Sequence, residues 1–432
     1  MKKAVIIKIA VISLAVCLVL IICLTLIITG CSKKKFPGKN NSSDINSSQN
    51  SDNSDYSNGE SSSGIDSGSA NSSSEIIVIK GGVSGDIANS ITVKSCGAKG
   101  DGNTDDASAI NSAIDRAKEK GGTVIFTSGN YKIGSNITFP LGISVKIDDG
   151  ATLYPVSSSI LYFNTETLDA PNKQIFYGEG EEKGFKSVYS VKIEWWGAVK
   201  NDGKDDSTAI QKALKASGGL LVLGEGSYNI NSSVDIGKSG LGSITKGIEI
   251  RGAGTDKTKF IISGGVTAFK NATSKDKLGP YSFNGISFEG ASGSDKTAEA
   301  LYIICNMNIT NCRFSNLKRG IYGDDAGYSC FVNNQAYNTE TVIDIGSATM
   351  FIYFGGNYTE NCGTFAKIIG AGAQTTGIQF YDNECRNSTG IDIIANFGGG
   401  DTLYINNCRF FGGTGETAIL AESILYPNFM NN

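Results

Sequence analysis

The chain has 432 residues, and its 38 Lys and Arg against 42 Asp and Glu give a net charge of -4, which offers no long-range attraction for nucleic acid. Histidine is absent from the sequence, which excludes Ser-His-Asp and Cys-His nucleophiles, histidine zinc ligands and histidine general bases. Any chemistry must therefore use Asp, Glu, Lys, Arg or Tyr, and we expect no nucleic-acid partner.

Residues 1–31 predict a membrane-targeting segment. A short basic start is followed by an almost uninterrupted apolar run that ends at Thr29-Gly30-Cys31. Small residues before a cysteine are typical of a bacterial lipoprotein signal, in which Cys31 would be lipidated and become the mature amino terminus. An uncleaved helical anchor is the alternative, because about 20 apolar residues span a bilayer. Both interpretations predict a protein held on the extracellular face of a bacterial membrane.

Residues 32–78 are rich in Ser, Asn, Asp and Gly, and contain little that could repay the entropy of ordering. We expect a disordered linker with a reach on the order of 35 to 40 Å. Seven cysteines follow this segment. Because seven is odd, the spacings are irregular and no C-x-x-C occurs, we expect small apolar core residues and no disulfide framework.

One stretch occurs twice in outline. CGAKGDGNTDDASAINSAI begins at Cys96, and WGAVKNDGKDDSTAIQKAL begins at Trp196. Apolar residues at helical spacing follow Asp105-Asp106 and Asp205-Asp206, so each copy predicts a short helix that starts at its aspartates and is followed by strands. An aspartate at a helix start accepts free backbone N–H groups and suits the helix dipole. We therefore interpret the paired aspartates as structural rather than catalytic.

This doubled layout resembles the amino-terminal module of the pectate lyase superfamily, as found in rhamnogalacturonase-like and polygalacturonase-like proteins and in phage tailspikes. The resemblance covers roughly residues 88–265 and implies an all-β fold, a right-handed parallel β-helix with short amino-terminal capping helices. The family uses one scaffold for hydrolases, lyases, epimerases and non-catalytic fibres, so the resemblance implies fold more than activity.

The carboxy-terminal half repeats with the period of such coils, about 20 to 28 residues. Matching segments place turn residues at Asn311, Asn334, Gly355, Asp382 and Asn407. Two inward columns are predicted from the same alignment: Ile309, Val332, Tyr353, Phe380 and Ile405, and then Phe314, Tyr337, Tyr358, Cys385 and Phe410. A third strand in each coil is predicted around Ile321, Ile343, Ile368, Ile391 and Ile419.

The third strand carries the candidate catalytic residues. Tyr322, Asp344, Lys367 and Asp392 alternate outward on successive coils, which would put Asp344 and Asp392 roughly 10 Å apart with Lys367 between them. Two such carboxylates are near the separation used by inverting glycosidases. Lys367 could alternatively abstract a proton beside a uronate carboxylate in a lyase, with calcium bound by the aspartates. An opposite-charge ladder on a solvated face is the simpler alternative.

Further candidates lie close to this strand or in other columns. Asp324 and Asp325 superficially resemble the paired aspartates of polygalacturonases, but the histidine motif of that family is absent. Arg319, Tyr322 and Glu384 are candidate substrate-binding residues, and a surface ion pair between Glu384 and Arg409 is the plainer interpretation of that glutamate. Tyr322, Tyr353 and Tyr404 are candidate aromatic lining of one cleft.

These observations predict four regions, namely the signal (1–31), the linker (32–78), a first cap module (79–190) and a second cap module with the β-helix (191–432). The predicted function is a surface-anchored protein that cleaves a polysaccharide by elimination or hydrolysis, without a cofactor unless a lyase binds calcium. A non-catalytic carbohydrate-binding or adhesive protein, and a tailspike-like structural module, are the alternatives. A monomer or a trimer is expected, and the trimer would accompany the tailspike-like module.

Overall fold

The computed structural model describes residues 89–119, 121–185, 191–242, 247–271, 278–291, 296–346, 350–370, 372–415 and 417–432. All of them belong to one compact unit, Gly82–Asn432. The predicted signal, its Cys31 and the predicted linker lie outside the described residues. Within the described ranges, no helix has the length and apolar character needed to cross a membrane.

Residues 90–183 form three short parallel sheets. The first has the order β1 (Ser90–Thr92), β3 (Thr123–Phe126), β6 (Ser144–Ile147) and β9 (Thr167–Asp169). The second contains β2 (Asp101–Asp105), β4 (Gly129–Ile133) and β7 (Ala151–Pro155), and the third contains β10 (Glu181–Lys183), β8 (Ile160–Phe163) and β5 (Ile137–Phe139). Stacked rings fill the interior, with Phe139, Phe163 and Phe185 in one run at centroid distances of 4.8 Å.

Three longer parallel sheets follow, and each is named here after its first strand. The β11 sheet has nine strands: β11 (Leu220–Val222), β14 (Glu249–Arg251), β17 (Tyr281–Asn284), β20 (Met307–Thr310), β23 (Cys330–Val332), β26 (Tyr353–Gly355), β29 (Ile378–Tyr381), β32 (Leu403–Asn406) and β35 (Pro427–Met430). The β12 sheet has eight: β12 (Gly226–Ile230), β15 (Thr258–Ile262), β18 (Ser287–Gly290), β21 (Arg313–Ser315), β24 (Gln335–Tyr337), β27 (Tyr358–Glu360), β30 (Glu384–Arg386) and β33 (Arg409–Phe411).

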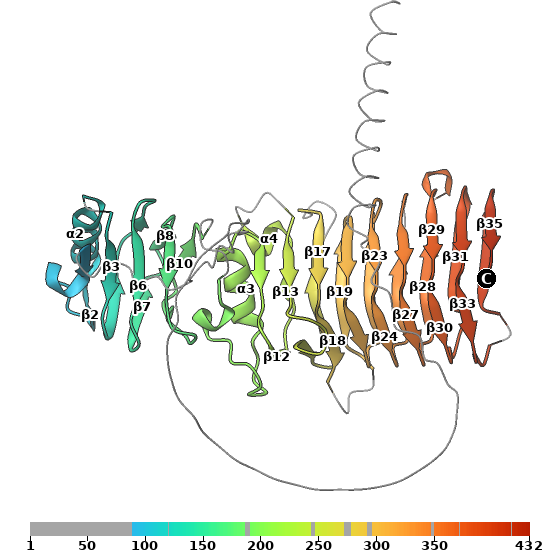
Figure 1. The fold of residues 1–432 in the computed structure, drawn as a ribbon, viewed down its shortest axis with the longest axis horizontal. Helices are drawn as coiled ribbons and strands as arrows, with labels where there is room; N and C mark the ends of the chain where they lie inside the picture. Colours follow the sequence, from blue (N-terminus) through green and yellow to red (C-terminus); the bar gives the residue numbers. More distant parts are fainter. Residues whose placement is uncertain are drawn as a thin grey trace, which may run out of the picture. The chain divides into compact units, whose positions relative to one another are not determined.

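The β13 sheet also has eight strands: β13 (Val234–Asp235), β16 (Thr267–Lys270), β19 (Glu299–Ile304), β22 (Arg319–Asp324), β25 (Thr341–Ile345), β28 (Thr364–Ile369), β31 (Ile393–Gly400) and β34 (Ile419–Ile424). Each coil of the chain adds one strand to each of the three sheets, and successive coils stack side by side (Figure 1). The predicted parallel β-helix is thereby confirmed.

Buried side chains stack once per coil along the β11 sheet. The column runs Ile309, Phe331, Phe354, Phe380 and Ile405, so these coils are 22 to 26 residues long. The Phe354 and Phe380 rings are stacked at 4.3 Å. The predicted column was wrong by one residue at Val332 and Tyr353, which face outward. The second column has the same error at Tyr337 and Tyr358, because Ala336 and Thr359 hold the inward positions.

The turns between the β11 and β12 sheets carry a buried amide ladder. Asn334, Asn357 and Asn383 hydrogen-bond to one another through side-chain amides and backbone N–H groups at 2.8 to 3.0 Å. The residue before each ladder position adopts positive φ, as Asn333, Gly356 and Asp382 do. Of the predicted turn residues, Asn311, Asp382 and Asn407 are at this positive-φ position, whereas Asn334 is in the ladder and Gly355 is in a strand.

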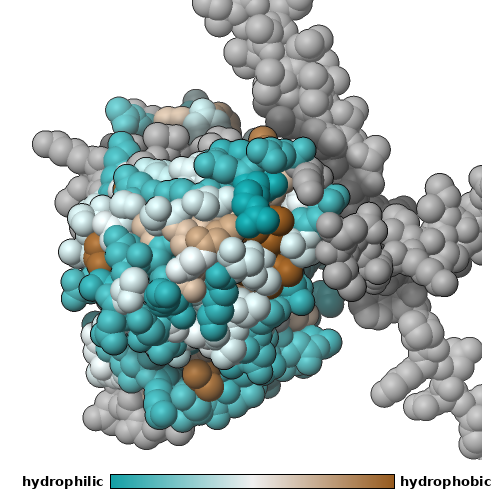
Figure 2. Space-filling model, turned by 90° about the vertical axis from the view of Figure 1, so that its left-hand side faces the viewer, coloured by the Kyte–Doolittle hydropathy of each residue, from teal (hydrophilic) through white to brown (hydrophobic). Residues whose placement is uncertain are grey.

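Helices follow both pairs of aspartates. Helix α2 spans Ala107–Lys118 and helix α3 spans Ser207–Ala216. Asp106 precedes α2, but its carboxylate accepts the N–H groups of Lys99 and Gly100 at 2.6 and 3.0 Å, in the glycine-rich loop. The outward residues of α2 are polar, and the face shown in Figure 2 is mainly hydrophilic.

The remaining helical segments are short: η2 (Val93–Cys96), η3 (Ile193–Trp196), α4 (Lys238–Leu241) and η5 (Gly372–Gln374). All seven cysteines of the described part are free thiols, and five of them are buried. The expectation that they act as small core residues is confirmed for those five, while Cys96 and Cys330 are half-buried.

Candidate functional site

The outward face of the β13 sheet gathers charged and aromatic side chains from successive coils. One column of register partners contains Thr267, Glu299, Arg319, Thr341 and Thr364. A second column, three residues further along each strand, contains Lys270, Tyr302, Tyr322, Asp344 and Lys367. Because parallel strands lie about 4.8 Å apart, side chains separated by twenty or more residues in sequence become direct neighbours here.

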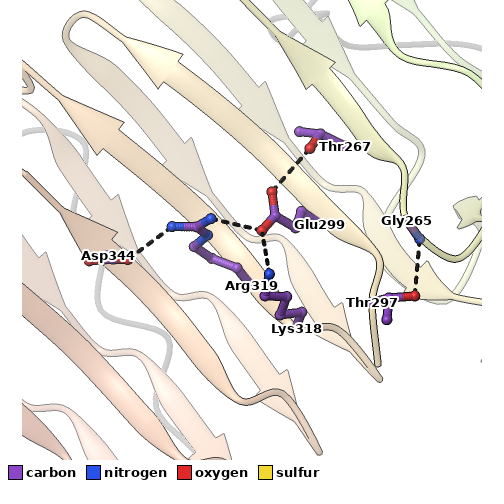
Figure 3. Close-up of polar contacts among 7 residues, drawn as sticks. All are labelled: Gly265, Thr267, Thr297, Glu299, Lys318, Arg319 and Asp344. Carbon is purple, nitrogen blue, oxygen red and sulfur yellow. Dashed lines mark hydrogen bonds and ion pairs between the residues drawn. The ribbon is translucent and has the colours of Figure 1, made fainter. Parts of the chain in front are cut away.

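Arg319 is the centre of an ionic cluster on this face (Figure 3). Its Nη2 lies 2.8 Å from Glu299 Oε1, and its Nη1 lies 3.0 Å from Asp344 Oδ2. Thr267 donates its hydroxyl to the other oxygen of Glu299 at 3.0 Å, and Lys318 Nζ is 3.9 Å from Oε1. Burial alone would lower the pKa of Arg319, but its bonds and charges with Glu299 and Asp344 outweigh burial and raise that pKa. The guanidinium is therefore a fixed cation between two carboxylates.

Two tyrosines stack beside this cluster. The ring centroids of Tyr302 and Tyr322 are 4.6 Å apart, and the guanidinium carbon of Arg319 lies 4.8 Å from the Tyr322 centroid. Burial raises the pKa of the Tyr322 hydroxyl, and the charges of Asp324 and Asp344 add to that effect. The phenol therefore remains protonated, so it can donate a hydrogen bond at neutral pH.

A hollow of about 400 Å³ adjoins the stack at the coils of β16 and β19. It is lined by Thr267, Lys270, Asn271, Glu299, Tyr302 and Arg319. Within the described ranges Lys270 has no ion-pair partner and is exposed. An aromatic ring, an ammonium group that pairs with no described carboxylate and several hydrogen-bonding side chains thus converge on one open depression. This is the arrangement expected of a binding site for a polar ligand.

The structure brings together only some of the predicted catalytic residues. Asp344 and Lys367 are direct register partners, as predicted. Asp392 was wrongly placed: the position beside Lys367 belongs to Ile394. Phe365 and Ala366 both donate their backbone N–H to the Asp392 carbonyl at 2.9 Å, which is the two-against-one pairing of a β-bulge.

The bulge turns the Asp392 side chain away from the sheet face. Its carboxylate is buried, accepts a bond from the Ser388 hydroxyl, and has a pKa raised by burial. The predicted inward column of the third strand was wrong at two positions. The observed inward residues are Ile321, Ile343, Ala366, Ile393 and Ile419. Ile368 lies on β28 two residues after the inward Ala366, and Ile391 lies two residues before the start of β31.

The other predicted residues divide between two sheets. Arg319 and Tyr322 belong to the cluster, and Asp324 ends the same strand β22. Asp325 follows in a turn with positive φ and donates its backbone N–H to Asp324 at 3.0 Å. Glu384 lies on the β12 sheet instead, where it pairs with Arg386 at 2.5 Å and Arg409 at 3.8 Å. The predicted ion pair of Glu384 is confirmed, and this residue is not part of the β13 face.

Sequence reasoning missed Lys270, Glu299 and Tyr302. The repeat alignment began at Ile309, so the coils of β16 and β19 were never placed in the columns. The signal was present: "EALYII" at Glu299 and "RGIYGD" at Arg319 share a charged residue followed three positions later by tyrosine. Aligning these two strands would have put the tyrosines in one stack.

Carboxyl groups with raised pKa lie elsewhere in the described part. Burial raises the pKa of Glu182 to about 7 and also raises those of Asp206 and Asp392, but none of these three groups faces the β13 surface. Among the described residues, no group of three or more Asp, Glu or Cys side chains is arranged to hold a metal ion.

Comparison with known proteins gives one family match and several distant structures. Residues 90–154 match the family model described as rhamnogalacturonase A/epimerase, pectate lyase-like. No curated protein matches the chain. An open-reading-frame product of Geobacillus virus E2 is similar at 15% identity and a TM-score of 0.29, over 56% of this chain and 61% of that one. The chain thus spans less than two thirds of the viral protein.

Two further structures cover more of the chain. The surface protein and adhesin PfbA of Streptococcus pneumoniae has 13% identity and a TM-score of 0.26, over 79% of this chain and 100% of that chain. The family 28 exopolygalacturonase of Yersinia enterocolitica has 9% identity and a TM-score of 0.24, over 79% of this chain and 78% of that chain.

Proposed function

We propose that this chain, a member of the pectate lyase-like superfamily, binds an acidic polysaccharide on the outward face of its β13 sheet. In this proposal the lipidated Cys31 holds the protein at the extracellular face of a bacterial membrane, and residues 32–78 separate the binding face from the lipid. The single observation that carries the proposal is the hollow beside the Tyr302–Tyr322 stack, where Lys270 and the Arg319 cluster meet.

The chemistry of the hollow suits a saccharide that bears carboxylates. Tyrosine offers an apolar ring face and a hydroxyl, which match the C–H face and the hydroxyl groups of a sugar ring. Lys270 supplies a cation that has no ion-pair partner among the described residues, while Thr267 and Glu299 can exchange hydrogen bonds with hydroxyls. Asn271 shapes the hollow from below, because it is buried and its amide is bonded to the Ile304 backbone. Lys367, two coils beyond Tyr322, places a second lysine on the same column, with Asp344 between them.

Cleavage at the same face is the second candidate, because Asp344 and Lys367 are register partners. A lysine could act as base and a carboxylate could assist it. The ion pairs of Asp344 and Glu299 with Arg319 favour binding over hydrolysis, since both carboxylates already have a fixed partner and neither is free to face a glycosidic oxygen. These two carboxylates are therefore occupied in holding the guanidinium.

The experiment measures retention of the full chain, purified in detergent, on immobilised polygalacturonate and alginate at low salt. Replacing Lys270 and Tyr302 by Ala should weaken retention about tenfold or more. The matched control replaces Lys259 and Tyr337, which lie on the β12 sheet, and should leave retention unchanged. Equal retention of the two double variants, or no retention of the wild-type chain, would reject the proposal.

The same samples decide between binding and cleavage. Incubation with each polysaccharide is followed by assays for new reducing ends and for the ultraviolet absorbance of a new conjugated double bond. Products that disappear in Asp344→Asn and Lys367→Met establish the enzyme. Retention without products establishes a binding protein.

A further inference from the structure

The outward face of the β11 sheet differs in chemistry from both other sheets. Seven strands of this sheet, β17, β20, β23, β26, β29, β32 and β35, each present two outward positions. None of these fourteen residues is Asp, Glu, Lys or Arg. Three of the fourteen are tyrosines and five are Asn or Gln. On the β12 sheet, by contrast, Arg313, Glu384, Arg386 and Arg409 all face outward.

Aromatic rings on this face are held outward by the backbone around them. Tyr353 is 38% exposed, and its ring lies across Gly355, where a Cβ atom would be 2.5 Å from the ring. Tyr381 stacks beside it at a centroid distance of 6.0 Å. Gly355 thus gives the Tyr353 ring the space to lie over the strand.

A second pair of rings borders the same strands. Tyr328 and Phe351, two residues before β23 and β26, are 66% and 52% exposed and have ring centroids 5.5 Å apart. Both adopt positive φ, +59° and +53°, a conformation that bulky residues rarely take. A Cβ atom at the neighbouring Gly377 would be 2.7 Å from the Phe351 ring, so this ring too lies over a glycine. Strained backbone that holds exposed rings is a feature of ligand-binding surfaces.

We propose that this face, the β11 face, is a second binding site, which takes an uncharged polysaccharide. Tyr353 and Tyr404 are two coils apart, about 10 Å, which is comparable to the length of two linked pyranose rings. Gln379 lies between these two tyrosines in the same column, and Asn406 follows Tyr404 two residues later on β32. The side-chain amides of both have no hydrogen-bonding partner among the described residues and are half-buried. Ring faces with free amides beside them match the alternating C–H faces and hydroxyls of a sugar chain.

An uncharged polymer suits this face better than an acidic one or a protein. Along the seven strands from β17 to β35 no cation faces outward to pair a carboxylate, and the Arg251 of β14 is already paired with Glu249. Burying an unpaired charge is costly. Aliphatic side chains are few, whereas a stable protein interface has an apolar core. The site is independent of the proposed β13 face, so either one can fail without the other.

The test measures binding of the full chain, in detergent, to a mixed-linkage glucan, a galactomannan and an arabinoxylan by affinity electrophoresis. Retardation by at least one of these uncharged polymers is expected, and it should not change when salt is raised, because no charge pairs are involved. Tyr353→Ala with Tyr381→Ala should weaken it about tenfold or more. Gly355→Ala, which displaces the Tyr353 ring and removes no aromatic group, should also weaken it.

The matched control is Tyr337→Ala with Tyr358→Ala, a pair on the β12 sheet with centroids 5.9 Å apart. It removes the same two side chains and should bind like the wild type. Thermal unfolding of each variant confirms that its fold is retained. The proposal is overturned if no uncharged polymer binds, if both tyrosine pairs behave alike, or if the Tyr353/Tyr381 variant only converts an oligomer to a monomer in sedimentation.

Discussion

Trp196 donates its indole N–H to the carboxylate of Glu182 at 2.8 Å. This bond connects strand β10 to η3, whose last residue, Trp196, is the first residue of the second copy of the repeated stretch. Burial raises the pKa of Glu182 to about 7, although the Trp196 bond acts in the opposite direction. Below that pH the carboxyl is therefore neutral at this junction.

Stability should consequently fall as pH rises from about 4.5 to about 7. In this range the folded chain holds a proton on Glu182 that the unfolded chain has lost, so ionisation favours unfolding. This difference in the pKa of Glu182 between the folded and the unfolded chain corresponds to about 3 kcal/mol in the free energy of unfolding. Urea unfolding at a series of pH values should show this decline, and Glu182→Gln should remove most of it and be more stable than the wild type above pH 7.

Glu181→Gln is the matched control. Glu181 is adjacent but pairs with Lys183 at 2.6 Å and Lys215 at 2.5 Å, and the bonds from these lysines lower its pKa. The stability that ionised Glu181 contributes is lost only as pH falls below the ordinary range of a glutamate. The Glu181→Gln variant should therefore still lose stability as pH rises from 4.5 to 7. The same pH profile in both variants would contradict the assignment to Glu182.

The amide ladder should be a main source of stability in the β-helix. Asn357 accepts the backbone N–H of Asn334 at 3.0 Å, donates to the Phe331 carbonyl at 2.9 Å and donates to Asn383 at 2.8 Å. Asn357→Leu would leave those buried groups without partners, at a cost of about 2 to 5 kcal/mol. Chemical unfolding measures the loss in the free energy of unfolding. Asn308 is an exposed asparagine of β20, so the control Asn308→Ala should change this free energy by less than about 0.5 kcal/mol. Similar losses in both would refute the ladder's role.

The repeating coil could be predicted because its period depends on residues that any coil needs. Apolar residues and asparagine turns recur every 22 to 26 residues, and this recurrence was sufficient to identify the fold and the pairing of Asp344 with Lys367. The register within a coil could not be predicted with the same certainty. The pattern predicts a turn at Gly355 because glycine suits turns, but Gly356 holds the positive-φ position and Gly355 lies in β26.

A single extra residue explains the failure at Asp392. In one coil the inward residue of the third strand, Ala366, comes five residues after the positive-φ residue Asn361. In the next coil the inward residue, Ile393, comes six residues after the positive-φ residue Asn387. Because side chains alternate, one added residue exchanges the two faces of a strand. Sequence alone does not reveal where such a bulge absorbs the addition.

Membrane attachment makes a separate prediction about Cys31. Cys31→Ser should abolish incorporation of a radiolabelled fatty acid in bacteria and leave an uncleaved precursor, because lipidation precedes removal of a lipoprotein signal. Cys23→Ser, within the apolar run, is the control and should be labelled like the wild type. Labelling that survives Cys31→Ser would indicate another attachment site, and a wild-type chain that takes up no label would favour the uncleaved anchor.

Arg319 should be needed both for the stability of the β13 face and for binding to it. Arg319→Met would leave Glu299 and Asp344 as neighbouring carboxylates with their shared partner removed. Since the side chains of Arg319, Glu299 and Asp344 are only partly buried, Arg319→Met should lower the free energy of unfolding by about 1 to 2 kcal/mol. Arg319→Lys should recover part of this, because an ammonium group cannot match the two-pronged contact of a guanidinium.

Lys318→Met is the control for loss of a positive charge, because Lys318 lies 3.9 Å from Glu299 and is more exposed. Repulsion between the two carboxylates predicts that the Arg319→Met defect shrinks at high salt. Unfolding and polygalacturonate retention, measured on the same samples, should both follow the order wild type, Arg319→Lys, Arg319→Met. If Lys318→Met equals Arg319→Met in both, net charge governs this face and the cluster geometry does not.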